Sequence, residues 1–315
     1  MSNHCHNQIL DLFNYELLFS LQGFVMSSDY ETVCYGKGTV SRKAGEGSFV
    51  SLKKLEYRED LAEFFLHKHA YEFAKKFAQG NRILDVGCGN GYGASELSLV
   101  ADEVTGIDFW KQGVNYCHNN RAGVATLVAS GTNLPFADNS FDLVVSSQVI
   151  EHIDVKQVTL YLNDIKRVLR PKGVFVVATP NRLLRLLPFQ KPWDPDHKKE
   201  YNAKELKSLL RSVFGNSDIT GVFATKCAYF TEYRRVKQSP VRVYLVDALA
   251  PMLLRLLPNN LLGKSKALYE KRYAVNKKES ERQSIDSCNF SLADFKESQL
   301  NLKSAITLYG VCEKT

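Results

Sequence analysis

The sequence predicts an α/β protein with a doubly wound sheet whose strands are mostly parallel. Short apolar runs alternate with segments of helical spacing from about residue 59 to residue 225. The run at 174–178 is continuously apolar, which is typical of a parallel strand covered on both faces. A glycine-rich turn joins one apolar run to an amphipathic segment. Right-handed crossovers would bring the carboxyl ends of these strands to one edge, where such sheets bind ligands.

The individual elements follow from the spacing of apolar residues. Residues 59–77 have helical spacing and predict a helix before the first strand. Six further segments predict strands; they are 82–87, 103–108, 124–129, 141–147, 173–179 and 218–225.

The turn after the first strand predicts a binding site for a small anionic or zwitterionic molecule. Asp85 lies inside the first apolar run, and glycines then occupy every second position from 87 to 93. Glycine permits positive φ and lets a ligand approach the backbone. The amphipathic segment 94–100 follows, and the start of a helix offers unpaired N–H groups to an anionic group.

Two carboxylates distinguish between cofactors for this turn. Dinucleotide-binding turns have the spacing G-x-G-x-x-G, whereas the glycines here alternate without that gap. Asp85 would repel a pyrophosphate and suits a cationic group. Asp108 ends the second strand and is placed to accept hydrogen bonds from both ribose hydroxyls. A cofactor that carries both an ammonium group and a ribose fits S-adenosyl-L-methionine.

Four blocks of the sequence resemble the class I S-adenosylmethionine-dependent methyltransferases, type 11 subgroup. They are 83–93, 104–108, 133–152 and 168–174. The resemblance implies a seven-stranded Rossmann-like sheet whose last strand is antiparallel, and 305–312 is the best candidate for that strand. It also implies a set of cofactor contacts: Asp85, Gly87, Cys88, Gly89, Asp108, Phe109, Ser130, Gly131, Ser147 and Gln148.

One position departs from the family pattern. The family often has an acidic residue for the adenine amino group where this chain has Ala129, Ser130 and Gly131. Ser130 can still form a hydrogen bond, but it is a weaker partner. We therefore expect a lowered affinity for the cofactor.

The resemblance also divides the chain. We expect an N-terminal extension at 1–58 packed over the site, a methyltransferase core at 59–233, an insertion at 234–300, and the final core strand within 301–315. Residues 234–279 hold eleven basic and three acidic side chains, an excess of +8 against a net charge of +7 for the whole chain. The positive charge therefore belongs to the insertion.

Two interpretations of this basic insertion compete. It is either a lid over the acceptor pocket or a surface that lies on an anionic membrane. A similar basic and leucine-rich stretch occurs at 182–187, but Pro251 and Pro258 interrupt the insertion and favour the lid. Nucleic acid is the least favoured partner because aromatic and basic residues do not interleave.

The composition is that of an ordinary globular protein, with 44% hydrophobic and 24% charged residues among 315. The seven cysteines are scattered and form no C-x-x-C pair, which favours a reducing cytoplasm. No apolar run reaches about 18 residues, and no signal peptide is recognisable. We expect a cytoplasmic protein, with peripheral contact at the inner membrane surface as the alternative.

The candidate catalytic residues follow the fourth and fifth predicted strands. Methyl transfer from a sulfonium mainly requires alignment of the acceptor, and a hydroxyl acceptor gains from a base. His152 is the first candidate for that base and His197 the second, with Glu151 beside them. Glu151 and His152 alternatively cap and brace a helix start. His197, Glu200 and Tyr201 resemble a loop of surface-polysaccharide-cluster and ubiquinone-pathway O-methyltransferases.

Several functions remain open at this stage. The first is methylation of a hydroxyl on a sugar, a glycolipid or another small molecule. The second is a membrane-surface methyltransferase of quinones or lipids, and the third is an inactive cofactor-binding protein with a partner-binding insertion. Some related enzymes gather Glu-x-x-Glu-His and a distant histidine around a metal. Gln148 replaces the first carboxylate here and is a poorer ligand for a hard cation, so we expect no metal.

Overall fold

The computed structural model describes residues 31–34, 39–42 and 58–315, except for Trp193, Pro195, 226–227 and 230–290. The basic cluster at 234–279 lies outside the described residues, as does the packing of the N-terminal extension. From that extension the structure describes the two strands β1 (Glu31–Cys34) and β2 (Thr39–Arg42), which pair antiparallel.

The core of the described chain is an eight-stranded sheet in the order β5-β4-β3-β6-β7-β10-β8-β9. The five strands from β5 to β7 are parallel, whereas β10 runs antiparallel to both β7 and β8. The strands are β3 (Arg82–Val86), β4 (Glu103–Asp108), β5 (Val124–Val128), β6 (Phe141–Ser147), β7 (Leu169–Pro180), β8 (Asp218–Ala224), β9 (Phe295–Ser298) and β10 (Thr307–Glu313).

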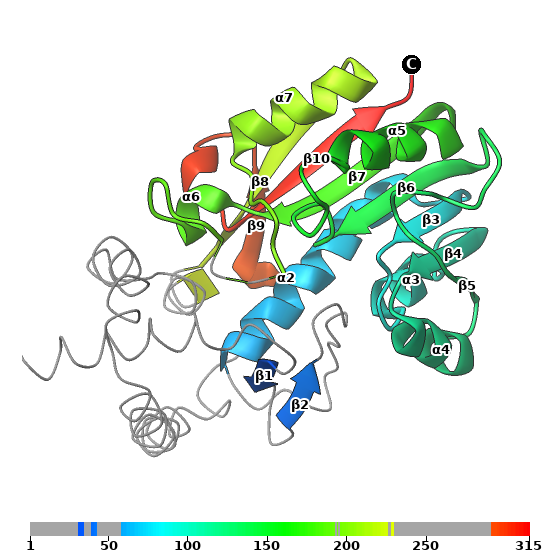
Figure 1. Cartoon of the computed structure of the whole chain (residues 1–315), viewed down its shortest axis with the longest axis horizontal. Coiled ribbons are helices and arrows are strands. Elements are labelled where there is room, and N and C mark those ends of the chain that lie inside the picture. The colour runs from blue at the N-terminus through cyan, green and yellow to red at the C-terminus, as the bar shows by residue number, and fades with distance from the viewer. Residues whose placement is uncertain are drawn as a thin grey trace, which may run out of the picture.

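Helices cover both faces of the sheet, as Figure 1 shows. One buried cluster joins the sheet to α2, α3 and α4, and a second joins it to α5 and α7. The helices are α2 (Arg58–Ala74), α3 (Tyr92–Leu97), α4 (Lys111–Asn120), α5 (Val158–Val168), α6 (Arg182–Arg185) and α7 (Ala203–Phe214). The strand order reverses between β3 and β6, and ligands bind at such a point in doubly wound sheets.

This architecture confirms the predicted fold class. The helix expected at 59–77 is α2 with a following 3-10 turn, and each of the seven expected strands is present to within a few residues. The strand expected at 305–312 is β10, which lies between β7 and β8.

Two features of the sheet differ from expectation. Strand β7 begins at Leu169 rather than at 173, and its pairing with β6 shifts register between Phe141 and Leu143. The sequence pattern places residues 295–298 in the insertion, whereas they form β9 and extend the sheet beside β8. The chain therefore returns to the core sheet earlier than the predicted boundary at residue 300.

None of the helices in the described part of the chain has the length and the apolar character needed to cross a bilayer.

Candidate active site

The glycine turn closes the end of β3 against β4. Gly87, Gly89 and Gly91 all have positive φ, at 82°, 54° and 74°. The backbone N–H groups of Gly87 and Cys88 both donate to the Ile107 carbonyl, at 2.8 and 2.9 Å. A side chain at Gly87 would lie 2.3 Å from Val149, so both the conformation and the space require glycine.

Asp108 closes the turn from the end of β4. Its carboxylate accepts the Gly89 N–H at 2.8 Å and the Trp110 N–H at 2.8 Å. Burial raises the pKa of Asp108, although these backbone donors and the nearby His152 oppose the rise. A carboxylate has about four acceptor positions, so capacity remains for ribose hydroxyls. The neighbouring Phe109 is 62% exposed and offers an aromatic face beside Asp108.

Asp85 lies fully buried near the end of β3. The Tyr71 hydroxyl from α2 donates to its carboxylate, at 3.2 Å to Oδ2. Burial raises the pKa of Asp85 to about 7; the Tyr71 hydrogen bond lowers it, and the negative charge of Asp108 raises it further. A cation at this carboxylate would stabilise its ionised form.

The remaining predicted cofactor contacts lie at the same edge of the sheet. Ser147 ends β6, and its buried hydroxyl has no hydrogen-bond partner among the described residues. The next residue, Gln148, has a positive φ of 57°. Cys88 is buried in the turn, and burial raises the pKa of its thiol. The unpartnered Ser147 hydroxyl and the open capacity of Asp108 fit a polar ligand such as S-adenosyl-L-methionine.

Ser130 and Gly131, the residues expected near the adenine, follow strand β5. The Ser130 hydroxyl lies 2.9 Å from the Thr132 hydroxyl and is therefore partnered within its own turn. A Cβ at Gly131 would lie 3.1 Å from Val86 and 3.3 Å from Tyr161, so a side chain there would fit only if these neighbours shifted slightly.

Glu151 braces the loop between β6 and α5. It is fully buried; the Thr179 hydroxyl of β7 donates to its Oε2 at 2.9 Å, and the Lys198 N–H donates to its carbonyl at 2.7 Å. Its Oε1 has no hydrogen-bond partner among the described residues. The alternative that Glu151 caps a helix is wrong, because the next helix begins at Val158 with Gln157 as its N-cap.

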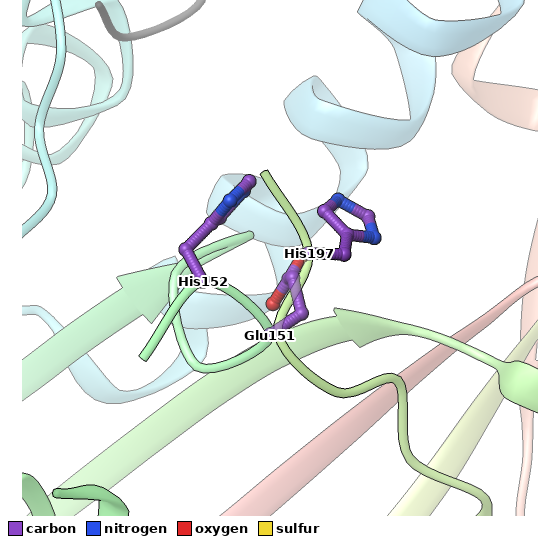
Figure 2. A group of neighbouring side chains, drawn as sticks. All are labelled: Glu151, His152 and His197. Atoms are coloured by element: carbon purple, nitrogen blue, oxygen red, sulfur yellow. The ribbon is translucent and has the colours of Figure 1, made fainter. Parts of the chain in front are cut away.

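The two candidate bases meet beside Glu151, as Figure 2 shows. The imidazole rings of His152 and His197 pack edge to face with centroids 4.7 Å apart. Nδ1 of His152 lies 3.2 Å from the Asp196 carbonyl, which can only accept, so this nitrogen donates. Nδ1 of His197 lies 2.8 Å from Oε1 of Glu200.

Opposing effects set the pKa values of His197 and its partner Glu200. Burial alone would lower the pKa of His197, but the bond to Glu200 and the charges of Glu151 and Asp194 raise it. Burial alone would raise the pKa of Glu200, but His197 and Arg185 hold it below its usual value. Glu200 is therefore the ionised acceptor, and Nδ1 of His197 carries the proton.

The same residues could also hold a metal ion. One ligand atom from each of Glu151, His152 and His197 lies within 4.8 Å of the others. Imidazole nitrogen and carboxylate oxygen are common ligands of divalent transition metals.

Three partners of the site have no recognisable signal in the sequence. Tyr71 on α2 contacts Asp85, and Thr179 on β7 contacts Glu151. Arg185 contacts Glu200 with its Nε at 3.0 Å and is 5% exposed. The stretch at 182–187 resembles the basic insertion in sequence, but it turns this basic side chain into the protein rather than toward a lid or lipid.

Comparisons with known proteins identify the family to which the chain is similar. A family model described as "Methyltransferase domain" matches residues 84–177. A probable S-adenosylmethionine-dependent methyltransferase of Mycolicibacterium smegmatis is 38% identical over 162 residues, which are 51% of this chain and 62% of that protein. A fatty-acid O-methyltransferase of the same species is 33% identical over 129 residues, 39% and 45% of the two chains.

A further relative matches over a larger share of its length. The ubiquinone biosynthesis O-methyltransferase of Sinorhizobium fredii is 31% identical over 190 residues, 55% of this chain and 75% of that protein. By contrast, the chain spans less than two thirds of the mycobacterial relatives.

The fold and the site define an α/β protein with a doubly wound sheet, a glycine turn and two buried carboxylates at the carboxyl edge of that sheet. The chain belongs to the class I S-adenosylmethionine-dependent methyltransferases of type 11. S-adenosyl-L-methionine is its cofactor.

Proposed function

We propose that this chain transfers the methyl group of S-adenosyl-L-methionine to a hydroxyl oxygen of a sugar, a glycolipid or another small molecule. The observation that carries the proposal is the pair of imidazoles at the carboxyl ends of β6 and β7. Each of them has Nδ1 engaged as a donor, so Nε2 is the nitrogen that would face an acceptor hydroxyl. Relatives named as O-methyltransferases support oxygen as the acceptor atom.

The residues divide between holding the cofactor and handling the proton. Asp108 would bind the ribose hydroxyls, Asp85 would face the ammonium group, and the turn at 87–89 would pack against the cofactor. When bound, the cofactor supplies an electrophilic methyl group. His152 is exposed and lies close enough to Asp108 to lower the pKa of that carboxyl. Exposure and closeness to the expected cofactor site favour His152 as the base. Nε2 of His152 would take the proton from the acceptor hydroxyl.

Replacement of His152 tests this assignment. We expect His152→Ala to reduce turnover by about 10²-fold or more, because general bases contribute about that factor. Turnover would be followed as labelled methyl transfer to a panel of sugars, glycolipids, quinols and fatty acids. Cofactor affinity, measured by calorimetry, should stay within twofold.

His118→Ala on α4 is the control, because this histidine is exposed on the outer helix. Full turnover by the His152 variant would contradict its role as the base.

The same panel separates the alternative functions. Transfer to a quinol or a fatty acid, with none to sugars, would favour the membrane-surface quinone or lipid methyltransferase. Cofactor binding without transfer to any acceptor would favour an inactive binding protein.

A metal-dependent reaction is a second candidate, favoured by the buried Oε1 of Glu151 beside the two histidines. EDTA treatment distinguishes the two. We expect turnover to survive EDTA, since the chain has Gln148 where related metal sites have a carboxylate. Loss of turnover that Mg²⁺ or Zn²⁺ restores would establish the metal.

A further inference from the structure

A buried charged pair lies behind the His197 imidazole. Nε of Arg185 lies 3.0 Å from Oε1 of Glu200, and the two side chains are 6% and 0% exposed. The same Oε1 lies 2.8 Å from Nδ1 of His197. One carboxylate oxygen therefore accepts from both a guanidinium and an imidazole, which fixes its position from two sides.

Burial of such a pair points to a role other than stability. Removing two charges from water costs free energy that their attraction only partly returns, so buried ion pairs are weak evidence for stability. The pair instead joins two separate segments, because Arg185 ends α6 and Glu200 precedes α7. It therefore fixes the loop that carries His197 against the carboxyl end of β7.

We infer that Arg185 and Glu200 are positioning residues that hold the His197 ring in one orientation with Nδ1 as the donor, so that Nε2 is presented to the acceptor beside His152. The inference rests on the proposed function for the role of His197 in transfer. A carboxylate behind a histidine fixes its tautomer in the same way in serine hydrolases and behind metal-bound histidines.

The surroundings of His197 agree with this role. Besides Glu200, the charged and titratable groups that face it are Asp194, Glu151, Arg185 and His152. Oδ2 of Asp194 lies 3.6 Å from Nε2, longer than a hydrogen bond, and this side chain is 32% exposed. Nδ1 is therefore held at hydrogen-bond distance by a buried partner, whereas the contact of Nε2 with Asp194 is longer; the His197 side chain itself is 7% exposed.

The tautomer of His197 tests the inference without any acceptor. In the full chain with cofactor, imidazole ¹⁵N shifts should show His197 protonated at Nδ1. The double variant Arg185→Met/Glu200→Met removes the charge and the acceptor together, so no charge is left buried alone. We expect it to show a mixture of the two tautomers, whereas Arg182→Met, which breaks the nearby 3.7 Å pair with Glu205, should leave the spectrum unchanged. An unchanged His197 spectrum in the double variant would overturn the inference.

Glu200→Gln separates the hydrogen bond from the charge, because the amide oxygen can still accept from Nδ1. We expect it to retain the Nδ1 tautomer. The double variant should lose about tenfold or more in kcat with cofactor affinity unchanged, and Glu200→Gln should lose less. An equal loss of kcat in the double variant and in Glu200→Gln would assign the effect to misfolding and contradict the positioning role.

Failure of the proposed function gives a different result. His197→Gln could keep full turnover while the double variant still shows a mixture of the two tautomers. In that case Arg185 and Glu200 position His197, but His197 does not act in methyl transfer. If the double variant keeps the tautomer, the positioning role fails whatever the turnover.

Discussion

At the scale of single residues, Asp108 has two tasks that substitution can separate. Its carboxylate holds the N–H groups of Gly89 and Trp110, and the proposal adds the ribose hydroxyls. Hydrogen bonds to charged groups contribute about 1.5–3 kcal/mol each. We expect Asp108→Ala to weaken binding of S-adenosyl-L-methionine by about 10²-fold or more, since each 1.4 kcal/mol corresponds to a factor of ten.

Two controls accompany this measurement by calorimetry. Asp108→Asn retains one acceptor oxygen for the glycine turn, so it should lose affinity with less effect on melting temperature. Asp102→Ala removes an exposed carboxylate at the other end of the same strand and should bind normally. Unchanged affinity in both Asp108 variants would contradict the cofactor assignment.

The buried Asp85 predicts a pH dependence of cofactor binding. Its pKa is raised to about 7, so the carboxyl is neutral below that pH and ionised above it. An ammonium group prefers the ionised form. We therefore expect affinity to rise between pH 5.5 and 7.5, by up to tenfold per unit below the midpoint. Tyr71→Phe removes a donor that lowers the pKa and should move the midpoint upward.

A matched ligand isolates the effect of Asp85. Adenosine shares the ribose and the base but has no ammonium group, so its affinity should change less over this range. Asp85→Asn should flatten the dependence for S-adenosyl-L-methionine. Parallel curves for the two ligands would show that Asp85 does not face the ammonium.

At the scale of the elements, β10 depends on a glycine in the middle of the sheet. A methyl group at Gly310 would lie 2.5 Å from Leu210 of α7 and 2.9 Å from Val177 of β7. Overpacking of this kind costs about 1–3 kcal/mol. We expect Gly310→Ala to lower the free energy of unfolding by that amount in urea denaturation, with a double variant as the check.

The check uses Leu210→Ala, which opens space above Gly310 and costs about 2–5 kcal/mol by itself. Because the two residues are in contact, the double variant should lose less than the sum of the single losses. Strict additivity would mean that α7 does not pack on β10 as described.

The elements also show what the sequence could predict. Parallel strands such as β6 and β7 are buried on both faces, so their apolar runs are easily recognised. Strand β9 was not predicted because Phe295 is its only apolar residue and it lies at the edge of the sheet, where one buried side chain is enough. Length and turn position alone do not distinguish such a strand from a loop.

The residues of the site also divide into those that the sequence predicts and those that it does not. Asp85 lies near the end of one predicted strand, Asp108 ends the next, and His152 lies in the loop after a third, so the edge of the sheet gathers them. The pair of Arg185 with Glu200 joins residues 15 positions apart through irregular loops, so no periodic pattern marks it. The basic character of 182–187 indicates a surface instead, because a sequence does not show which charge is buried.

At the scale of the whole molecule, one alternative function is methyl transfer at a membrane surface. Stable association of a peripheral protein needs apolar insertion as well as charge, and charge alone is screened over about 8 Å at physiological ionic strength. The net charge is +7, and the most exposed large apolar side chain among the described residues is Phe189, which is 97% exposed. We expect the chain to float with vesicles containing phosphatidylserine at low salt, and to be released at about 0.15 M salt because binding is mainly electrostatic.

Phe189→Ser provides the matched variant for this flotation experiment, since the side chain makes little contact within the described chain. If binding is electrostatic, the variant should float as the wild type does at low salt, and neutral vesicles should bind neither protein. Flotation that persists above 0.15 M salt and is lost in Phe189→Ser would show apolar insertion. That result would place the acceptor in or at the bilayer, and it would favour a quinone or lipid over a sugar as the molecule methylated.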